Sequence, residues 1–142
     1  MKLTKQTDYA LRILIYSALQ SGERLISIQE VTAAYGLSRN HVMKIVQKLG
    51  QEGFLSTLRG RGGGFRLSRS PEDIRLGDVV RSMEADLVLV ECDEPVCQIS
   101  PACKLRGVLE AAMSAFMEVL DQYTLADLCG NKQELSELLL LG

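Results

Sequence analysis

The sequence of 142 residues has no hydrophobic run long enough to cross a membrane. Arg12 interrupts the most apolar N-terminal stretch, and the C-terminal leucine run at 138–141 has only four residues. A signal-peptide layout is also missing, so we expect a cytoplasmic protein. No repeat, low-complexity segment, cofactor fingerprint, catalytic triad or base–nucleophile pair is present, which argues against an enzyme. Hydrophobic residues make up 46% of the chain and charged residues 24%, which suits a packed core and excludes general disorder.

Basic and acidic residues are distributed unevenly. Residues 1–80 contain 12 Lys or Arg and 7 Asp or Glu, whereas residues 81–142 contain 4 and 11. A basic half followed by an acidic half is typical of a nucleic-acid-binding protein with a separate sensing or pairing segment. Charge alone leaves a chance distribution equally open.

Capping signals and apolar spacing predict three N-terminal helices. We expect them at residues 5–20, 28–35 and 39–51. The first should stop at Ser21-Gly22, the second opens with the capping box of Ser27 and Glu30, and Gly36 should end it. Two helices joined by a tight glycine-containing turn indicate a helix-turn-helix.

The third helix and the segment after it predict a DNA-binding surface. Two strand-like runs at 54–58 and 65–68 flank a basic, glycine-rich segment, so we expect a β-hairpin wing. From residue 38 to 69 there are seven Lys or Arg and one acid, Glu52. The fold class predicted is therefore mainly α with a small β-hairpin wing, a winged helix-turn-helix. The predicted DNA-binding residues are Ser38, Arg39, Asn40, His41, Lys44, Gln47, Lys48, Arg59 and Arg61.

The remaining chain predicts a short helix, a cysteine-bearing linker and a long helix. The short helix should start at Pro71-Glu72-Asp73, and the long helix of about 23 residues should start at Ser100-Pro101. A last amphipathic piece is expected from Gln133 to Leu141. The long helix is too apolar for so small a domain to cover, so we expect a homodimer. The predicted units are the DNA-binding domain at 1–80, the cluster loop at 81–104, and the dimerisation and C-terminal helices at 101–142. The apolar stripe of the long helix comprises Leu105, Val108, Leu109, Ala112, Phe116, Val119, Leu120 and Tyr123.

Three of the four cysteines are concentrated in one short segment. Cys92, Cys97 and Cys103 form a C-x4-C-x5-C pattern, with Cys103 expected in the first turn of the long helix. Disulfides are rare in a cytoplasmic chain, and paired zinc knuckles are missing. Two other interpretations remain: a zinc site in which one further ligand joins the three cysteines, or three free cysteines with a structural role. Sulfur ligands favour an iron–sulfur cluster, whose fourth position would be exchangeable, as suits a sensor.

Together these segments resemble the family of iron–sulfur winged-helix transcriptional regulators. The resemblance rests on the three cysteines and on residues 7–12, 38–45, 59–67, 74–80 and 123–128. The stretches at 38–44 and 99–105 are most similar to the nitric-oxide-sensing repressors of that family. The resemblance implies a homodimer that binds a palindromic operator on double-stranded DNA and releases it when nitric oxide attacks the cluster. Regulators of the same family that sense iron or cluster supply are the alternative.

The resemblance also implies a ligand set. Cys92, Cys97 and Cys103 match the cluster cysteines of the family, with [4Fe-4S] favoured and [2Fe-2S] as the runner-up. One branch adds a histidine three residues after the last cysteine, but here Arg106 stands there and a cation cannot ligate a metal. In the nitric-oxide-sensing branch an acidic residue from the other subunit can serve, and the matching residue is Asp8. The alternative for Asp8 is an ion pair with Arg12 one turn later.

Two further residues carry weaker expectations. His41 is the single histidine, and we expect it to face DNA or solvent rather than to ligate a metal. Cys129 matches no motif, and we expect it to be a small buried residue.

Overall fold

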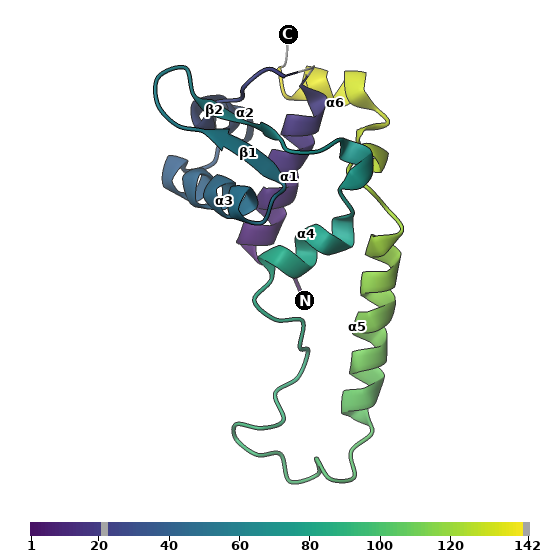
Figure 1. Cartoon of the computed structure of the whole chain (residues 1–142). Helices are drawn as coiled ribbons and strands as arrows, with labels where there is room; N and C mark the ends of the chain where they lie inside the picture. Colours follow the sequence, from purple (N-terminus) through teal and green to yellow (C-terminus); the bar gives the residue numbers. More distant parts are fainter. Residues whose placement is uncertain (21–22, 141–142) are drawn as a thin grey trace.

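The computed structural model describes residues 1–20 and 23–140. A winged-helix unit (residues 5–83) forms one end of the molecule, and α5 projects from it with the loop that precedes it (Figure 1). The helices of this unit are α1 (Lys5–Leu19), α2 (Ile28–Tyr35), α3 (Arg39–Gln51) and α4 (Leu76–Met83), and its strands are β1 (Leu55–Leu58) and β2 (Gly64–Leu67). The other helices are η1 (Pro71–Asp73), α5 (Leu105–Asp121), η2 (Ala126–Cys129) and α6 (Lys132–Leu138).

Local capping fixes the ends of the helix-turn-helix where the sequence predicts them. The Glu30 N–H donates to Ser27 Oγ at 3.1 Å, and the Ser27 N–H donates to Glu30 Oε2 at 3.0 Å, which completes the capping box. Gly36 ends α2 with a positive φ of 66°, a conformation that favours glycine. Ser38 caps α3 by accepting the His41 N–H at 3.2 Å. The predicted stop of the first helix at Ser21-Gly22 lies outside the described residues.

One hydrophobic core holds the winged-helix unit together. It is formed where α1, α3, α4 and the wing face one another, and each contributes side chains from one stripe of its surface. Its largest fully buried side chains are Ile13, Leu14, Ile26, Val31, Val42, Ile45, Leu49, Phe65, Ile74, Val79, Met83 and Leu125. None of the helices at 1–20 and 23–140 is long and apolar enough to span a membrane.

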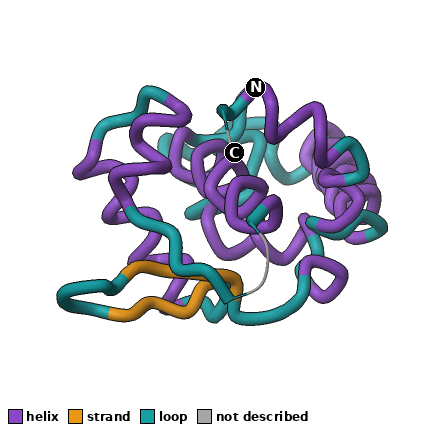
Figure 2. The backbone as a smooth tube through the Cα atoms, turned by 90° about the horizontal axis from the view of Figure 1, so that it is seen from above, coloured by secondary structure: helices purple, strands orange, loops and turns teal. Residues whose placement is uncertain are grey.

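The wing is an antiparallel hairpin anchored to the helices at its base. Leu55 pairs with Leu67 and Leu58 with Gly64, and the tip extends beyond the helices (Figure 2). Ile26 and Phe65 exchange backbone hydrogen bonds of 2.8 and 2.9 Å, a third pairing that the sequence did not reveal. Glycine is required in the tip, because a Cβ at Gly63 would lie 2.2 Å from the Leu58 carbonyl oxygen.

One predicted helix is divided in two, and another begins later than predicted. The helix expected from Pro71 divides into η1 and α4, because Ile74 has an extended backbone. The long helix begins at Leu105 rather than at Ser100-Pro101 and has 17 residues. Its start is displaced because the preceding segment forms two turns, in which the Ser100 N–H donates to the Cys97 carbonyl at 3.1 Å and the Ala102 N–H to the Ile99 carbonyl at 3.0 Å.

The C-terminal part of the chain returns to the winged-helix unit. The Leu125 side chain is completely buried in the core, and η2 packs on α1. Within residues 101–142, predicted to hold the dimerisation and C-terminal helices, α5 projects, whereas the segment after it packs against the DNA-binding unit. The predicted last helix, Gln133 to Leu141, is observed as α6, and Leu141 lies outside the described residues.

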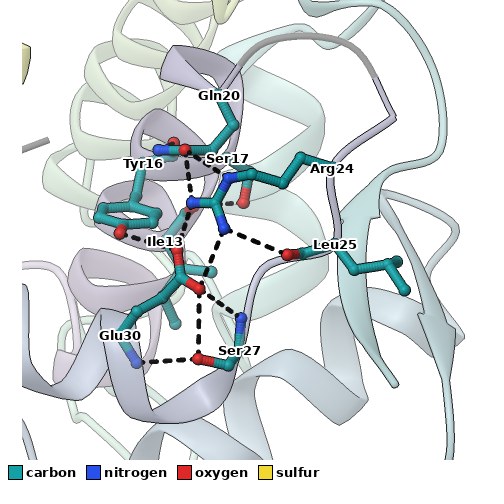
Figure 3. Close-up of polar contacts among 8 residues, drawn as sticks. All are labelled: Ile13, Tyr16, Ser17, Gln20, Arg24, Leu25, Ser27 and Glu30. Atoms are coloured by element: carbon teal, nitrogen blue, oxygen red, sulfur yellow. Dashed lines mark hydrogen bonds and ion pairs between the residues drawn. The ribbon is translucent and has the colours of Figure 1, made fainter. Parts of the chain in front are cut away.

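A polar network fastens α1 to the start of α2 (Figure 3). The Arg24 guanidinium donates to both carboxylate oxygens of Glu30 and to Gln20 Oε1, and the Tyr16 hydroxyl donates to Glu30 Oε1 at 2.9 Å. Burial of the Glu30 carboxyl opposes its ionisation, but hydrogen bonds from Arg24, the Ser27 backbone and Tyr16 outweigh it and lower its pKa to about 2.

The Glu30 network should make folding sensitive to acid. Because the pKa of Glu30 is depressed in the folded state, its contribution is complete above about pH 4.5 and is lost as the pH falls toward 2. Glu30→Gln should therefore lower the free energy of unfolding at neutral pH by about 1–2 kcal/mol, with allowance for the half-exposed Arg24, and should flatten this acid dependence. Urea unfolding of metal-free protein between pH 3 and 7 measures both.

Glu110→Gln is the matched control, because the ion pair of Glu110 with Arg106 lies on an exposed helix surface. We expect no measurable change in that variant. Equal effects of the two substitutions would contradict a special role for the Glu30 network.

Candidate nucleic-acid interface and cysteine centre

The outer face of α3 presents the predicted base-reading side chains to solvent. Arg39, Asn40, Lys44 and Gln47 are exposed, and Lys48 is half-buried. The opposite face of the helix carries the core residues Val42, Ile45, Val46 and Leu49. Arginine, asparagine and glutamine side chains can form paired hydrogen bonds with base edges, and lysine binds phosphates. The exposed face of α3 therefore has the chemistry of a recognition helix.

His41 contacts α1 from the first turn of the recognition helix. Its ring is half-buried and packs edge-on against Tyr9 of α1, with ring centroids 5.0 Å apart. The Arg12 guanidinium lies 5.4 Å from the centroid of the same Tyr9 ring, and the Tyr35 hydroxyl donates to the Arg12 carbonyl at 2.8 Å. His41 thus docks the first turn of α3 onto α1. Sequence reasoning missed the role of Tyr9, which only its place in a family motif singled out.

The wing adds a second basic surface. Arg59 and Arg61 are exposed at its tip, and a cleft lined in part by Arg39, Thr57 and Gly60 separates the wing from α2 and α3. Guanidinium groups at the tip of a hairpin can bind phosphates or enter a minor groove. The recognition helix and the wing together can contact both a major groove and the neighbouring backbone.

Cys92 and Cys97 are held in one turn, and Cys103 follows shortly before α5. The Cys97 N–H donates to the Cys92 carbonyl at 3.0 Å, and Asp93 and Val96 form a bridge inside this turn. All three thiols are free and partly exposed. Cys103 precedes the helix, so the prediction that it lies in the first helical turn is wrong. The cysteine loop (residues 84–104) lies at the end of the molecule opposite α6 (Figure 1).

The donor chemistry of the loop fits an iron–sulfur cluster. Three unpaired thiols within reach of solvent supply the sulfur ligands that iron prefers. Across residues 1–20 and 23–140 of one protomer, however, no three Cys, His, Asp or Glu side chains are gathered into a metal-binding group. The residue types therefore fit the cofactor, whereas a complete ligand set is not gathered among the described residues of this chain.

Asp8 and Arg106 are the two positions at which the family resemblance places a possible fourth cluster ligand. Both carboxylate oxygens of Asp8 accept hydrogen bonds from Arg12, at 3.0 and 3.2 Å, so the ion pair considered as the alternative for Asp8 is present. Arg106 pairs with Glu110 at 3.0 Å, and this hydrogen bond, followed by the charges of Glu110, Asp93 and Cys92, raises its pKa. Arg106 is thus held as a cation beside the loop and cannot be a ligand.

The apolar stripe of α5 is largely uncovered. Leu105, Val108 and Val119 expose 56, 62 and 53% of their surface, whereas Met117 is buried against the winged-helix unit. An isolated soluble domain rarely leaves such a stripe open to water. α5 therefore presents an unusually large apolar surface to solvent.

Cys129, predicted to be a small buried residue, is half-buried in η2. Burial raises the pKa of its thiol. It lies beside α1 and away from the cysteine loop, so its surroundings favour the unreactive thiol form.

These features define a winged-helix DNA-binding protein with a projecting apolar helix and a cysteine-bearing loop. Residues 3–131 match the family model of Rrf2, described as "Iron-dependent Transcriptional regulator". The chain belongs to the Rrf2 family and is a transcriptional regulator. It is 48% identical to the HTH-type transcriptional regulator NsrR of Bacillus subtilis, over 98% of this chain and 97% of that protein. It is 46% identical to NsrR of Halalkalibacterium halodurans, over 99% of both chains.

Comparison of the fold with solved structures supports the family assignment. The global cysteine regulator CymR of B. subtilis matches with a TM-score of 0.75 and 30% identity, over 92% of this chain and 98% of that one. IscR of T. potens matches with a TM-score of 0.75 and 27% identity, over 94 and 90% of the two chains. The predicted winged-helix fold and the predicted resemblance to NsrR are confirmed.

Proposed function

We propose that this regulator is a nitric-oxide-responsive repressor that binds a palindromic operator as a homodimer. Cys92, Cys97 and Cys103 would hold an iron–sulfur cluster, with [4Fe-4S] favoured over [2Fe-2S], and the partner's Asp8 would complete the ligand set. The observation that carries the proposal is the set of three free thiols on one loop, in a chain that is nearly half identical along its whole length to regulators named NsrR. An uncovered apolar α5 beside that loop supports the homodimer.

The residues of this chain would perform distinct parts of the task. The exposed face of α3 reads bases, and Arg59 and Arg61 hold the wing on the DNA backbone. Cys92, Cys97 and Cys103 would hold the cluster, whose iron would supply the site of reaction with nitric oxide. Each carboxylate oxygen of Asp8 accepts one hydrogen bond from Arg12 and keeps a further lone pair, so Asp8 could serve as a ligand while it stays paired with Arg12. Because Arg12 lies against the Tyr9 ring, and Tyr9 against His41, Asp8 is connected through Arg12 and Tyr9 to the recognition helix.

The decisive experiment uses anaerobically purified protein. Optical and Mössbauer spectra should report a cluster that nitric oxide destroys, and binding to a palindrome selected by the wild-type protein from a random duplex pool should be lost in parallel. Persistence of DNA binding after the cluster has reacted would contradict the proposal.

A sensor of iron or cluster supply is the second candidate function. The "Iron-dependent" description of the family and the likeness to T. potens IscR favour it. Chelation of iron during growth separates the two: a supply sensor releases its target genes under chelation without nitric oxide, whereas a nitric-oxide sensor with an intact cluster does not.

The two parts of the DNA interface should respond differently to substitution. Arg59→Ala and Arg61→Ala should weaken binding to all duplexes and each reduce the slope of log affinity against log salt by about 1, since wing arginines neutralise phosphates. Asn40→Ala or Gln47→Ala should instead cost about 1–3 kcal/mol of discrimination at particular base pairs. Fluorescence anisotropy across a salt series measures both effects.

Lys132→Ala is the control for lost positive charge, because Lys132 is exposed on α6, away from α3 and the wing. It should leave the salt slope unchanged. Wing variants that bind DNA like the wild-type protein at every salt concentration would exclude the wing from the interface.

A further inference from the structure

The attachment of α5 to the winged-helix unit depends on a compact group of three residues. Gly77 and Arg81 lie on α4, and Asp121 is the last residue of α5. Both terminal nitrogens of Arg81 donate to the Asp121 carboxylate, each at 2.7 Å, in the paired geometry that gives an arginine–carboxylate contact its direction. Asp78 lies 3.6 Å from Arg81 on the side of α4 and is a secondary partner.

Gly77 makes room for this contact. A Cβ at position 77 would lie 1.8 Å from Asp121 Oδ1 and 2.9 Å from Arg81 Nη1. The obstructing atom is the end of the Asp121 side chain, so an added methyl group would displace the carboxylate without forcing the backbone of α4 to move. The Asp121 carboxylate can therefore occupy this position because residue 77 has no side chain.

Backbone hydrogen bonds fasten the same place. The Leu76 N–H donates to the Tyr123 carbonyl at 3.0 Å, and the Leu125 N–H donates to the Ile74 carbonyl at 2.8 Å. These bonds fix the point where α5 ends, but a short pairing at one end of a helix leaves its direction to the side chains. α4 is the helix on which α5 packs, so the side chains between α4 and α5 set that direction.

We propose that Gly77, Arg81 and Asp121 form a positioning clamp that sets the angle between α5 and the winged-helix unit, and through it the half-site spacing that the dimer accepts. This inference rests on the proposed homodimer and palindromic operator. Two recognition helices must enter successive major grooves about 34 Å apart, so the angle at which each unit leaves the dimer helix selects the spacing. The clamp residues do not contact DNA; they act through the placement of α3.

The test compares clamp variants on re-spaced operators. The probe is a palindrome selected by the wild-type dimer from a random duplex pool, rebuilt with its half-sites moved apart or together by one and two base pairs. Gly77→Ala, Arg81→Gln and Asp121→Asn should reduce affinity for the selected spacing about tenfold, a difference of about 1.4 kcal/mol, and should equalise affinity among spacings. Arg81→Lys keeps the charge without the paired geometry and should be intermediate.

Other measurements separate positioning from loss of fold. The clamp variants should stay dimeric in sedimentation, melt cooperatively, and bind a duplex with a single half-site as the wild-type protein does. Asp121→Asn preserves the shape of the side chain and provides the test if Gly77→Ala fails to fold. Gly130→Ala is the matched control, since within residues 1–20 and 23–140 a Cβ there meets only the Asp127 carbonyl oxygen at 4.0 Å.

The outcomes distinguish the clamp from the proposed function. Clamp variants that retain the wild-type preference among spacings would overturn the clamp and leave the repressor intact. Wild-type protein that does not dimerise, or does not bind a palindrome, would overturn both.

Discussion

Replacement of Cys92, Cys97 or Cys103 by alanine is expected to abolish both the visible chromophore and operator-specific binding. Each thiol is free and is one of three sulfur donors on the cysteine loop, so each replacement leaves only two thiolates on that loop to hold a cluster. Affinity for the operator should fall toward the non-specific level, a loss of about a thousandfold or more. Anaerobic absorption spectra and anisotropy on the selected palindrome measure the two losses in the same samples.

Cys129→Ala is the matched control, because Cys129 is half-buried in η2 beside α1. It should change neither the chromophore nor DNA binding. Cluster-free protein that holds the operator as tightly as the loaded protein would leave a DNA-binding fold without a sensor.

The proposed role of Asp8 can be separated from its ion pair. Asp8→Ala removes both the carboxylate ligand and the partner of Arg12, whereas Arg12→Gln removes the ion pair and the contact of Arg12 with Tyr9 but keeps the carboxylate. Asp8→Ala should retain some cluster but change its stability or its rate of reaction with nitric oxide, and Arg12→Gln should leave both as in the wild-type protein. Identical behaviour of the two variants would exclude Asp8 as a ligand.

Val119→Glu is expected to convert the dimer into monomers. Val119 exposes 53% of its surface in the protomer, so a carboxylate there costs the isolated fold little but would be buried if α5 pairs with a second copy. A monomer contacts one half-site at a time, and loss of the linked second contact should weaken operator binding at least about a hundredfold. Sedimentation velocity and anisotropy measure the two effects.

Ala111→Glu provides the comparison, because Ala111 is also exposed on α5 but lies on its polar side with Glu118. That variant should remain dimeric. A folded, dimeric Val119→Glu protein would show that the dimer interface does not include the apolar stripe of α5.

The helix-turn-helix could be predicted from sequence because local signals determine it. The cap at Ser38 and the left-handed turn at Gly36 act over three or four residues, and α3 runs from Arg39 to Gln51 as predicted. A serine and a proline before a long apolar stripe form an equally local signal, but it gave the wrong start for α5 because turns at 97–102 compete with it.

Features that depend on distant residues were not predictable. Nothing near Ile26 shows that it pairs with Phe65, and nothing near Gly77 shows that Asp121 occupies the space above it. The predicted site was identified by residue type, since thiols and basic side chains reveal their chemistry in the sequence. The half-buried setting of His41 and the division of the C-terminal segment depend on packing that only the fold supplies.

Because α5 is long, a small rotation at the clamp produces a large displacement at the opposite end of the helix. A helix of 17 residues is about 25 Å long, so a rotation of about 10° at its Asp121 end moves its Leu105 end by about 4 Å. The cysteine loop therefore adjoins the end of α5 that moves furthest when the helix rotates at Gly77. A displacement of a few ångströms among the thiols corresponds to only a small rotation of the winged-helix unit relative to α5. A distance probe placed at Leu105 will therefore report that rotation far more sensitively than a probe placed at Gly77.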